Sequence, residues 1–172
     1  MTFAAMERKL YLLLGSNLGD RFGVLKQARK RLEARFGKVS KASSFYATAA
    51  WGNTAQPDFI NQVLLFECSL EPQEVLSILL VTEEELGRVR KEKWGPRTID
   101  IDLLIYGDLL VDNTNLKIPH PELHKRRFTL VPLCELAEEE LHPKLGKTYS
   151  KLLEMCEDGL NVKKTEAVEY EV

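Results

Sequence analysis

The sequence has few cysteines, only three histidines and no long apolar run, and each shortage excludes a class of protein. Cys68, Cys134 and Cys156 lie far apart and lack the spacing of a metal site or a disulfide framework. We therefore expect reduced thiols in a cytoplasmic protein. No apolar stretch approaches the roughly 18 residues that a membrane span needs, so a membrane protein is not expected.

The chain also lacks an excess of charge of either sign. It carries 24 Lys and Arg against 26 Asp and Glu, a net charge of −2. This balance disfavours a general nucleic-acid binder, although basic residues cluster at 88–97 and 125–127. At 172 residues and 44% hydrophobic content, without internal repeats, the sequence favours a single domain. We expect a core of about residues 9–138, a C-terminal extension of 139–172, and a monomer.

The order of the expected elements predicts the fold class. Strands are expected at residues 10–14, 39–46, 59–68 and 99–106, and helices at 22–36 and 72–86. The first strand is a continuous apolar run, as in a strand buried on both faces. This β-α-β-β-α-β order predicts an α+β, ferredoxin-like fold with one antiparallel sheet and two helices on one face. Two further helices are expected at 130–137 and 148–156, and the charged end 163–172 is expected to fray.

The strongest functional signal is the run from Trp94 to Tyr106, WGPRTIDIDLLIY. Asp is depleted in strands, yet Asp100 and Asp102 alternate with Ile and Leu in a strong strand pattern. Strand geometry puts both carboxylates on one face, roughly 7 Å apart. Two carboxylates held side by side repel each other unless a cation neutralises them. Oxygen ligands without nearby Cys or His favour Mg²⁺, which commonly shares its shell with nucleotide phosphates.

A basic stretch precedes this strand and can supply the other half of a phosphate site. Its members are Arg88, Arg90, Lys91, Lys93 and Arg97. The alternative interpretation is a solvated strand face on which the two acidic residues fall by chance.

Two other motifs are weaker. The loop 15–20 lies between a strand and a helix but fits no P-loop pattern, so a structural turn is favoured, with Asn17 able to line a nearby pocket. His120 and His124 are four apart, a spacing that zinc sites use. However, Pro121 follows His120 and no third ligand is suitably spaced. We expect His120 to donate to phosphate oxygens instead.

Phe59 and Asn61 are two residues apart and therefore share one face of an expected strand. A stacking ring beside a donor and acceptor amide is a suitable arrangement for a planar heterocycle. The alternative is a core Phe and a surface Asn. Trp94, between basic residues and Gly95-Pro96, is equally open to a packing or a ligand-clamping role.

Taken together, the segments resemble the hydroxymethyl-dihydropterin pyrophosphokinases of folate biosynthesis. The resemblance covers nearly the whole chain, and the Trp-Gly-Pro-Arg-Thr-x-Asp-x-Asp run is highly specific to that family. The matching segments are YLLLGSN at 11–17, SFYAT at 44–48, QPDFIN at 56–61, GRVR at 87–90, WGPRTIDID at 94–102, IPHP at 118–121, RRF at 126–128 and PLCELA at 132–137.

The resemblance implies an ATP-dependent enzyme that transfers the terminal pyrophosphoryl group of ATP to the hydroxymethyl group of a reduced pterin, leaving AMP. Asp100 and Asp102 would hold two Mg²⁺ ions and, with Arg88 and Arg97, would form the catalytic set. The implied ATP-binding residues are Glu83, Arg88, Arg97, His120 and Arg126. The implied pterin-binding residues are Thr48, Phe59, Asn61, Trp94, Asp100 and Phe128, with the two Phe rings stacking on the pterin.

The resemblance further implies a lid loop holding Arg90 and Trp94 that closes once both substrates are bound. The chain departs from the family pattern in several places. Phe59 stands where Tyr is common, Leu80 where some relatives are polar, and Pro121 where others have an aromatic residue. We do not expect contacts from Leu80 or Pro121. No dedicated general base is identified, and the proton could pass to Asp102 or leave a metal-activated hydroxyl.

Two alternatives remain. RNA-recognition modules share the element order, but they need paired aromatic residues and a basic face on the sheet. The chain has neither on its central strands. A catalytically silent nucleotide- or pterin-binding protein is the second alternative, and the presence of Asp100, Asp102, Arg88 and Arg97 disfavours it.

Overall fold

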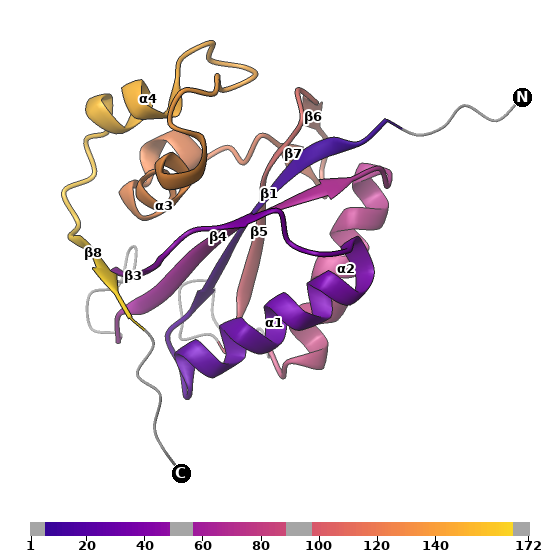
Figure 1. The fold of residues 1–172 in the computed structure, drawn as a ribbon. Coiled ribbons are helices and arrows are strands. Elements are labelled where there is room, and N and C mark those ends of the chain that lie inside the picture. Colours follow the sequence, from indigo (N-terminus) through magenta and orange to yellow (C-terminus); the bar gives the residue numbers. More distant parts are fainter. Residues whose placement is uncertain (1–5, 49–56, 89–97, 167–172) are drawn as a thin grey trace, which may run out of the picture.

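A computed structural model describes residues 6–48, 57–88 and 98–166 (Figure 1). In chain order its elements are β1 (Arg8–Ser16), α1 (Arg21–Phe36), β2 (Lys41–Ala42), β3 (Phe45–Thr48), β4 (Phe59–Cys68), α2 (Pro72–Glu85), β5 (Asp100–Tyr106), β6 (Val111–Asp112), β7 (Lys117–Ile118), a 3-10 turn (Leu123–Lys125), α3 (Arg127–Ala137), α4 (Tyr149–Met155) and β8 (Val162–Thr165).

The main sheet has the strand order β5-β1-β4-β3-β8, and β2 also pairs with β4. Every pairing in it is antiparallel. Without β8, this is the order expected when two split β-α-β units interleave, so the predicted α+β, ferredoxin-like arrangement is confirmed. β5 lies at one edge of the sheet, and this position determines the shape of the site described below.

Helices cover both faces of the sheet, as Figure 1 shows. Leu10, Leu12 and Leu14 of β1 pack under α1 and α2, whereas Tyr11 and Leu13 pack under α3 and α4. Successive strand residues point to opposite faces, so an uninterrupted apolar strand needs cover on both sides. The expectation of helices on one face was therefore incomplete, because the C-terminal part of the chain supplies the second layer.

The ends of the first two helices agree with their sequence signals. Asp20 caps α1 by accepting a hydrogen bond from the Gly23 N–H at 3.0 Å. Pro72 occupies the first turn of α2, where its missing N–H is harmless. Gly87 follows α2 with a φ of +86°, a conformation that favours glycine. The chain is thereby turned so that Arg88 points back toward β5.

Three local expectations were wrong. The strand expected at 39–46 is two short strands, β2 and β3, because Ser43 turns inward and its Oγ accepts from the Val63 N–H. In the tail expected to fray at 163–172, residues 163–165 instead belong to β8, which pairs with β3 and satisfies its outer edge. Residues 167–172 lie outside the described residues. Asn17 is buried and donates to the Pro57 carbonyl rather than lining the cavity.

The C-terminal extension is tied to the core by side chains. Glu140 accepts hydrogen bonds from Tyr11 and Lys9 of β1. Asp158 accepts from the Arg127 N–H at 3.0 Å, which caps the start of α3 from a distant part of the chain. These contacts fix the helix end that carries Arg126 and Phe128. Among the described residues, no helix has the length and apolar character of a membrane span.

Candidate active site

A cavity of about 720 Å³ opens at the end of the sheet where β5 begins. Asp100 and Asp102 face one side of β5, while Ile101 and Leu103 face the other, and all four line the cavity. A cavity can reach both faces of a strand that lies at a sheet edge, and β5 is such a strand. The cavity therefore continues from the face under α3, past β5, to the side of α2.

The candidate residues that the structure describes all line this cavity. They are Thr48, Phe59, Asn61, Glu83, Arg88, Asp100, Asp102, His120, Arg126 and Phe128. Arg90, Trp94 and Arg97 lie outside the described residues. The fold thus brings together side chains from β3, β4, α2, β5 and the start of α3, separated by up to 80 positions in sequence.

Part of the cavity is an uncharged floor built by the strand register. Gly15 of β1 pairs with Asn61 of β4 on one side and with Asp100 of β5 on the other. Thr48 of β3 pairs with Phe59, two residues before Asn61 and so on the same face. We call Gly15, Thr48, Phe59 and Asn61 the neutral floor.

One hydrogen bond fixes the orientation of the Asn61 side-chain amide in the neutral floor. Asn61 Nδ2 donates to Thr48 Oγ1 at 2.7 Å, and the two residues are only 3% and 2% exposed. Asn61 Oδ1 is thereby turned toward Gly15, where a Cβ would lie 2.5 Å from it. Only a residue without a side chain at position 15 leaves room for the Asn61 side-chain oxygen, which is a hydrogen-bond acceptor at the cavity.

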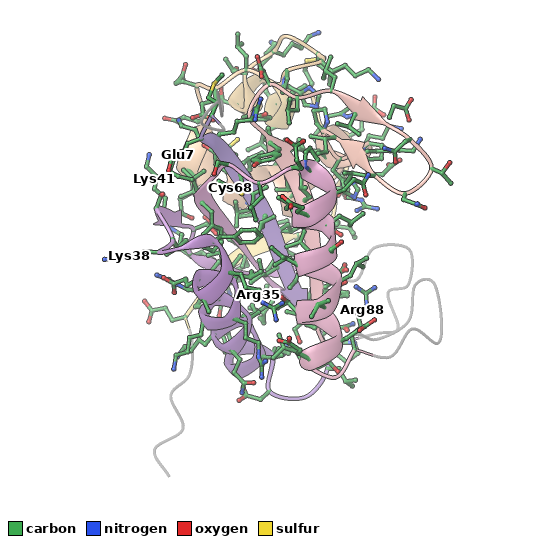
Figure 2. All side chains as sticks on the ribbon, turned by 90° about the vertical axis from the view of Figure 1, so that its right-hand side faces the viewer. Glu7, Arg35, Lys38, Lys41, Cys68 and Arg88 are labelled. Atoms are coloured by element: carbon green, nitrogen blue, oxygen red, sulfur yellow. The ribbon has the colours of Figure 1, made fainter. Side chains whose placement is uncertain are left out.

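The opposite part of the cavity carries charge. Arg88 Nη1 donates to Asp100 Oδ1 at 2.8 Å and also to Glu83 Oε2. The same Glu83 oxygen accepts the Ile101 N–H at 3.0 Å. We call Glu83, Arg88, Asp100, Asp102 and Arg126 the charged wall. In Figure 2 Arg88 is labelled just beyond the end of α2.

Burial and pairing act against each other in the charged wall. Burial raises the pKa of Glu83, while Arg88 and the Ile101 N–H favour its carboxylate form. Burial also opposes the charge of Arg88, yet the carboxylates of Asp100 and Glu83 raise its pKa overall. The wall is thus a set of mutually compensated charges rather than a solvated acidic patch.

The two Asp carboxylates meet the requirements of a Mg²⁺ site that is completed by substrate. Both are partly exposed, both line the cavity, and their spacing follows from the strand. Within residues 6–48, 57–88 and 98–166, no group of three or more His, Cys, Asp or Glu forms an all-protein metal cage. Mg²⁺ in nucleotide sites is commonly held by one or two carboxylates and by phosphates, which fits this donor set.

His120 is a neutral hydrogen-bond donor. Burial, aided by the positive charge of Arg126, lowers the pKa of His120 to about 4. Its Nδ1 accepts the Glu122 N–H at 3.1 Å, so the ring proton resides on Nε2. The zinc alternative for His120 and His124 has no support in the described residues.

Phe128 and Arg126 stand at the start of α3, and both line the cavity. The Arg126 guanidinium carbon lies 5.6 Å from the centre of the Phe128 ring, within the range of a cation–π contact. Phe59 and Phe128 thus line one cavity from two different elements, as stacking on a shared heterocycle requires.

Several cavity residues were not anticipated from the sequence. Leu76 and Leu79 of α2, with Leu116, form an apolar section beyond β5, and Gln73, Asn115 and Lys117 stand nearby. Leu80 and Pro121 also line the cavity, although no contact was expected of them. The helical spacing of the leucines indicated burial, but it could not distinguish packing into a core from lining a cavity.

The sequence matches the family of 7,8-dihydro-6-hydroxymethylpterin-pyrophosphokinase (HPPK) over residues 11–138. The chain belongs to this family. The matched range contains all the candidate residues of the cavity and ends one residue after α3. The HPPK match excludes the extension that carries Glu140, Asp158 and β8.

Curated relatives agree with this assignment. The chain is 45% identical over 134 residues to the 2-amino-4-hydroxy-6-hydroxymethyldihydropteridine pyrophosphokinase of Aquifex aeolicus, covering 78% of this chain and 83% of that protein. It is 43% identical over 145 residues to the protein of the same name from Synechocystis, covering 84% of this chain and 74% of the relative.

The fold is also similar to solved structures. A crystal structure of wild-type Plasmodium falciparum HPPK-DHPS with pteroate matches with a TM-score of 0.71 and 15% identity. The match covers 90% of this chain and 43% of that one, so this chain spans less than half the length of the solved structure. At this identity the likeness supports the fold.

Proposed function

We propose that this chain transfers the pyrophosphoryl group of ATP to 6-hydroxymethyl-7,8-dihydropterin, a step of folate biosynthesis. The hydroxymethyl oxygen attacks the β-phosphorus of ATP and forms a new P–O bond. The bond between the β-phosphorus and the oxygen bridging it to the α-phosphate breaks, and AMP leaves. The hydroxyl proton is released, and the products are AMP and the pterin pyrophosphate.

One observation carries the proposal: the charged wall and the neutral floor line one cavity, with Asp100 at their junction. The floor offers an acceptor oxygen and an aromatic ring, suited to a pterin that presents N–H donors and flat faces. The apolar section beyond β5, lined by Leu76, Leu79 and Leu116, suits the flat base of a nucleotide. Between them, the wall suits phosphates.

The chain's own residues orient the reacting groups. Asn61 and Phe59 hold the pterin against the floor, with Phe128 on the other face of its ring. Arg88, Arg126 and the Nε2–H of His120 bind phosphate oxygens, and we assign Arg97 to the same task. In phosphoryl transfer, positioning and charge neutralisation supply most of the rate enhancement.

We propose Mg²⁺ as the cofactor, with two ions held by Asp100 and Asp102 and by the phosphates. When bound, the metal neutralises charge on the transferred group and lowers the pKa of the attacking hydroxyl. The oxygen-only donor set and the partial exposure of both carboxylates support this assignment.

We further propose that the enzyme acts as a monomer in the cytoplasm. All three cysteines are free, and Cys68 is buried, which is consistent with a reducing compartment. The wall and floor come from a single chain, so the cavity needs no residue from a second copy.

Product analysis tests the function. The chain, incubated with Mg-ATP and hydroxymethyl-dihydropterin, should produce AMP and the pterin pyrophosphate in equal amounts, which chromatography of the nucleotides measures. ADP as the main product would mean attack on the γ-phosphorus and would overturn the proposal. If no pterin-dependent nucleotide turnover occurs in well-folded protein, the binding-protein alternative is supported instead.

A further inference from the structure

One member of the charged wall, Glu83, is a buried carboxylate. The side chain of Glu83 is 4% exposed and comes from the last turn of α2. Its Oε2 accepts hydrogen bonds from Arg88 Nη1 and from the Ile101 N–H. The family resemblance implied a contact between Glu83 and the nucleotide, whereas both of these bonds run to protein groups.

These bonds place Glu83 at the junction of three segments. It joins the end of α2 to Arg88, which follows the Gly87 turn, and to the backbone of β5 between the two Asp residues. A buried ionised carboxylate is strongly destabilising unless it is paired and hydrogen-bonded. Losing Arg88 from this position would remove a charge-assisted hydrogen bond from the buried Glu83 carboxylate, so the pair is expected to stay together.

The second partner of Arg88 is different in kind. Asp100 is more exposed than Glu83, with side-chain exposures of 22% and 4%, and it is one of the two carboxylates assigned to the metal. A guanidinium and a divalent cation on one carboxylate repel each other. Arg88 must therefore weaken its bond to Asp100 when a metal–nucleotide complex enters, and the released N–H groups match phosphate oxygens in geometry and charge.

We propose that Glu83 is a positioning residue that retains the Arg88 guanidinium in the cavity while Arg88 exchanges Asp100 for phosphate oxygens of the nucleotide. The inference rests on the proposed function, because it requires a metal–nucleotide substrate at this site. Glu83 acts through Arg88. Glu83 should therefore affect the binding of nucleotides that carry β- and γ-phosphates, and it should have little effect on the binding of AMP.

A binding experiment separates this role from direct contact and from a purely structural role. Calorimetry with Mg²⁺ compares a non-hydrolysable ATP analogue with AMP, for wild type, Glu83→Gln, Arg88→Met and the double variant. Glu83→Gln should weaken analogue binding about tenfold, the scale of a hydrogen bond to a charged group. AMP affinity should change by less than about twofold on the same scale.

The double variant tests whether Glu83 acts through Arg88. In the Arg88→Met background, Glu83→Gln should cause no further loss of analogue affinity, because the coupled interaction is already absent. The double variant removes both charges of the Glu83–Arg88 pair together, so it provides a second test if either single variant fails to fold. Glu84→Gln is the matched control, since it removes the same charge from the exposed neighbouring residue.

A second titration, with Mg²⁺ alone and without nucleotide, tests the exchange at Asp100. Arg88→Met and the double variant should bind Mg²⁺ at least about threefold more tightly than wild type, because a cation that competes for Asp100 is removed. Nuclear magnetic resonance of the β5 amides measures this affinity without any turnover.

The outcomes are distinguishable. Wild-type protein that binds neither the analogue nor pterin would overturn the proposed function. Two results in protein that binds both ligands would show that Glu83 does not act through Arg88. In the first, Glu83→Gln lowers the affinities for AMP and for the analogue equally. In the second, Glu83→Gln lowers the analogue affinity of Arg88→Met as much as it lowers that of wild type. Unchanged Mg²⁺ affinity in both Arg88 variants would overturn the exchange.

Discussion

The charged wall, from α2, β5 and the start of α3, and the neutral floor, from β1, β3 and β4, line one cavity, yet they depend on different physical effects. In the wall, Arg88 lies between Glu83 and Asp100, so ion pairs in a partly buried site hold this region together. The floor holds Asn61 through one hydrogen bond to Thr48, and Asn61 Oδ1 lies closely against Gly15. Charges at the wall can change partners when substrates arrive, whereas the floor keeps one shape.

This difference predicts how each region responds to change. Ligand binding at the exposed parts of the wall should weaken with added salt, because salt screens Coulomb interactions. It should also weaken when a substitution removes one of the charges. The floor should be sensitive to volume, because a buried, well-packed surface cannot move without loss of contacts. The following predictions test the comparison, from the largest expected effect to the smallest.

The largest effect is expected at the metal-binding carboxylates. Asp100→Asn and Asp102→Asn should each raise the barrier by about 4 kcal/mol, roughly a thousandfold in kcat/KM, because each removes a metal anchor. Thermal unfolding should stay within a few degrees of wild type, since both side chains are partly exposed. Steady-state kinetics over a range of Mg²⁺ concentrations measures the effect.

Asp108→Asn removes the same charge from an exposed turn just after β5 and should leave kinetics unchanged. Turnover near the wild-type rate in either site variant, with the same Mg²⁺ dependence, would refute the metal assignment.

A smaller effect is expected from filling the floor. In Gly15→Ala the new Cβ would meet Asn61 Oδ1 at 2.5 Å and Phe59 Cδ1 at 3.4 Å. Such overpacking costs about 1–3 kcal/mol, so pterin affinity should fall roughly ten- to hundredfold. Fluorescence titration with pterin measures this loss, and AMP affinity in the same variant should be unchanged.

Gly159→Ala is the control, because a Cβ there meets nothing within 4 Å. An equal loss of pterin and AMP affinity in Gly15→Ala would mean that floor and wall are not separate, and the comparison would fail.

The smallest effect concerns His120, a neutral group beside the charged wall. Its pKa is lowered to about 4 by burial and by Arg126, against an ordinary value near 6.5 in the unfolded chain. Between these values the unfolded state binds more protons, so the free energy of unfolding should decrease as the pH falls from about 6.5 to 4. Above pH 6.5 the group contributes no pH dependence.

Urea unfolding at pH 7 and pH 5 measures the decrease, which His120 and the buried His142, with a pKa also lowered to about 4, should share. His120→Gln should remove up to about 2 kcal/mol of it. A stability that rises toward pH 5 would show that His120 is charged in the folded protein.

Much of this molecule was predictable from local patterns. The continuous apolar run in β1 indicated burial on both faces, and the alternation around Asp100 and Asp102 placed both carboxylates on one face. Asp20 and Gly87 stand at helix ends, where these residue types are common. These signals succeed because the period of a strand or helix relates a residue to neighbours only a few positions away.

Other features were not predictable because they depend on distant pairings. β8 pairs with β3 across more than a hundred residues, and its charged sequence alone indicated fraying. Leu80 and Pro121 line the cavity only because α2 and the segment after β7 meet beside β5. Neither sequence spacing nor residue type contains that information.

By itself, the sequence determined which side chains could carry the chemistry: two carboxylates on one strand face, a basic segment before them, and an aromatic residue beside an amide. The tertiary structure alone decided how they are used. It placed β5 at the sheet edge, so that one cavity reaches both of its faces. It buried Glu83 behind Arg88 and turned the Asn61 oxygen toward Gly15. The physical reason is that periodicity acts over a few residues, whereas burial, register and ion pairing depend on segments that meet only in the folded chain.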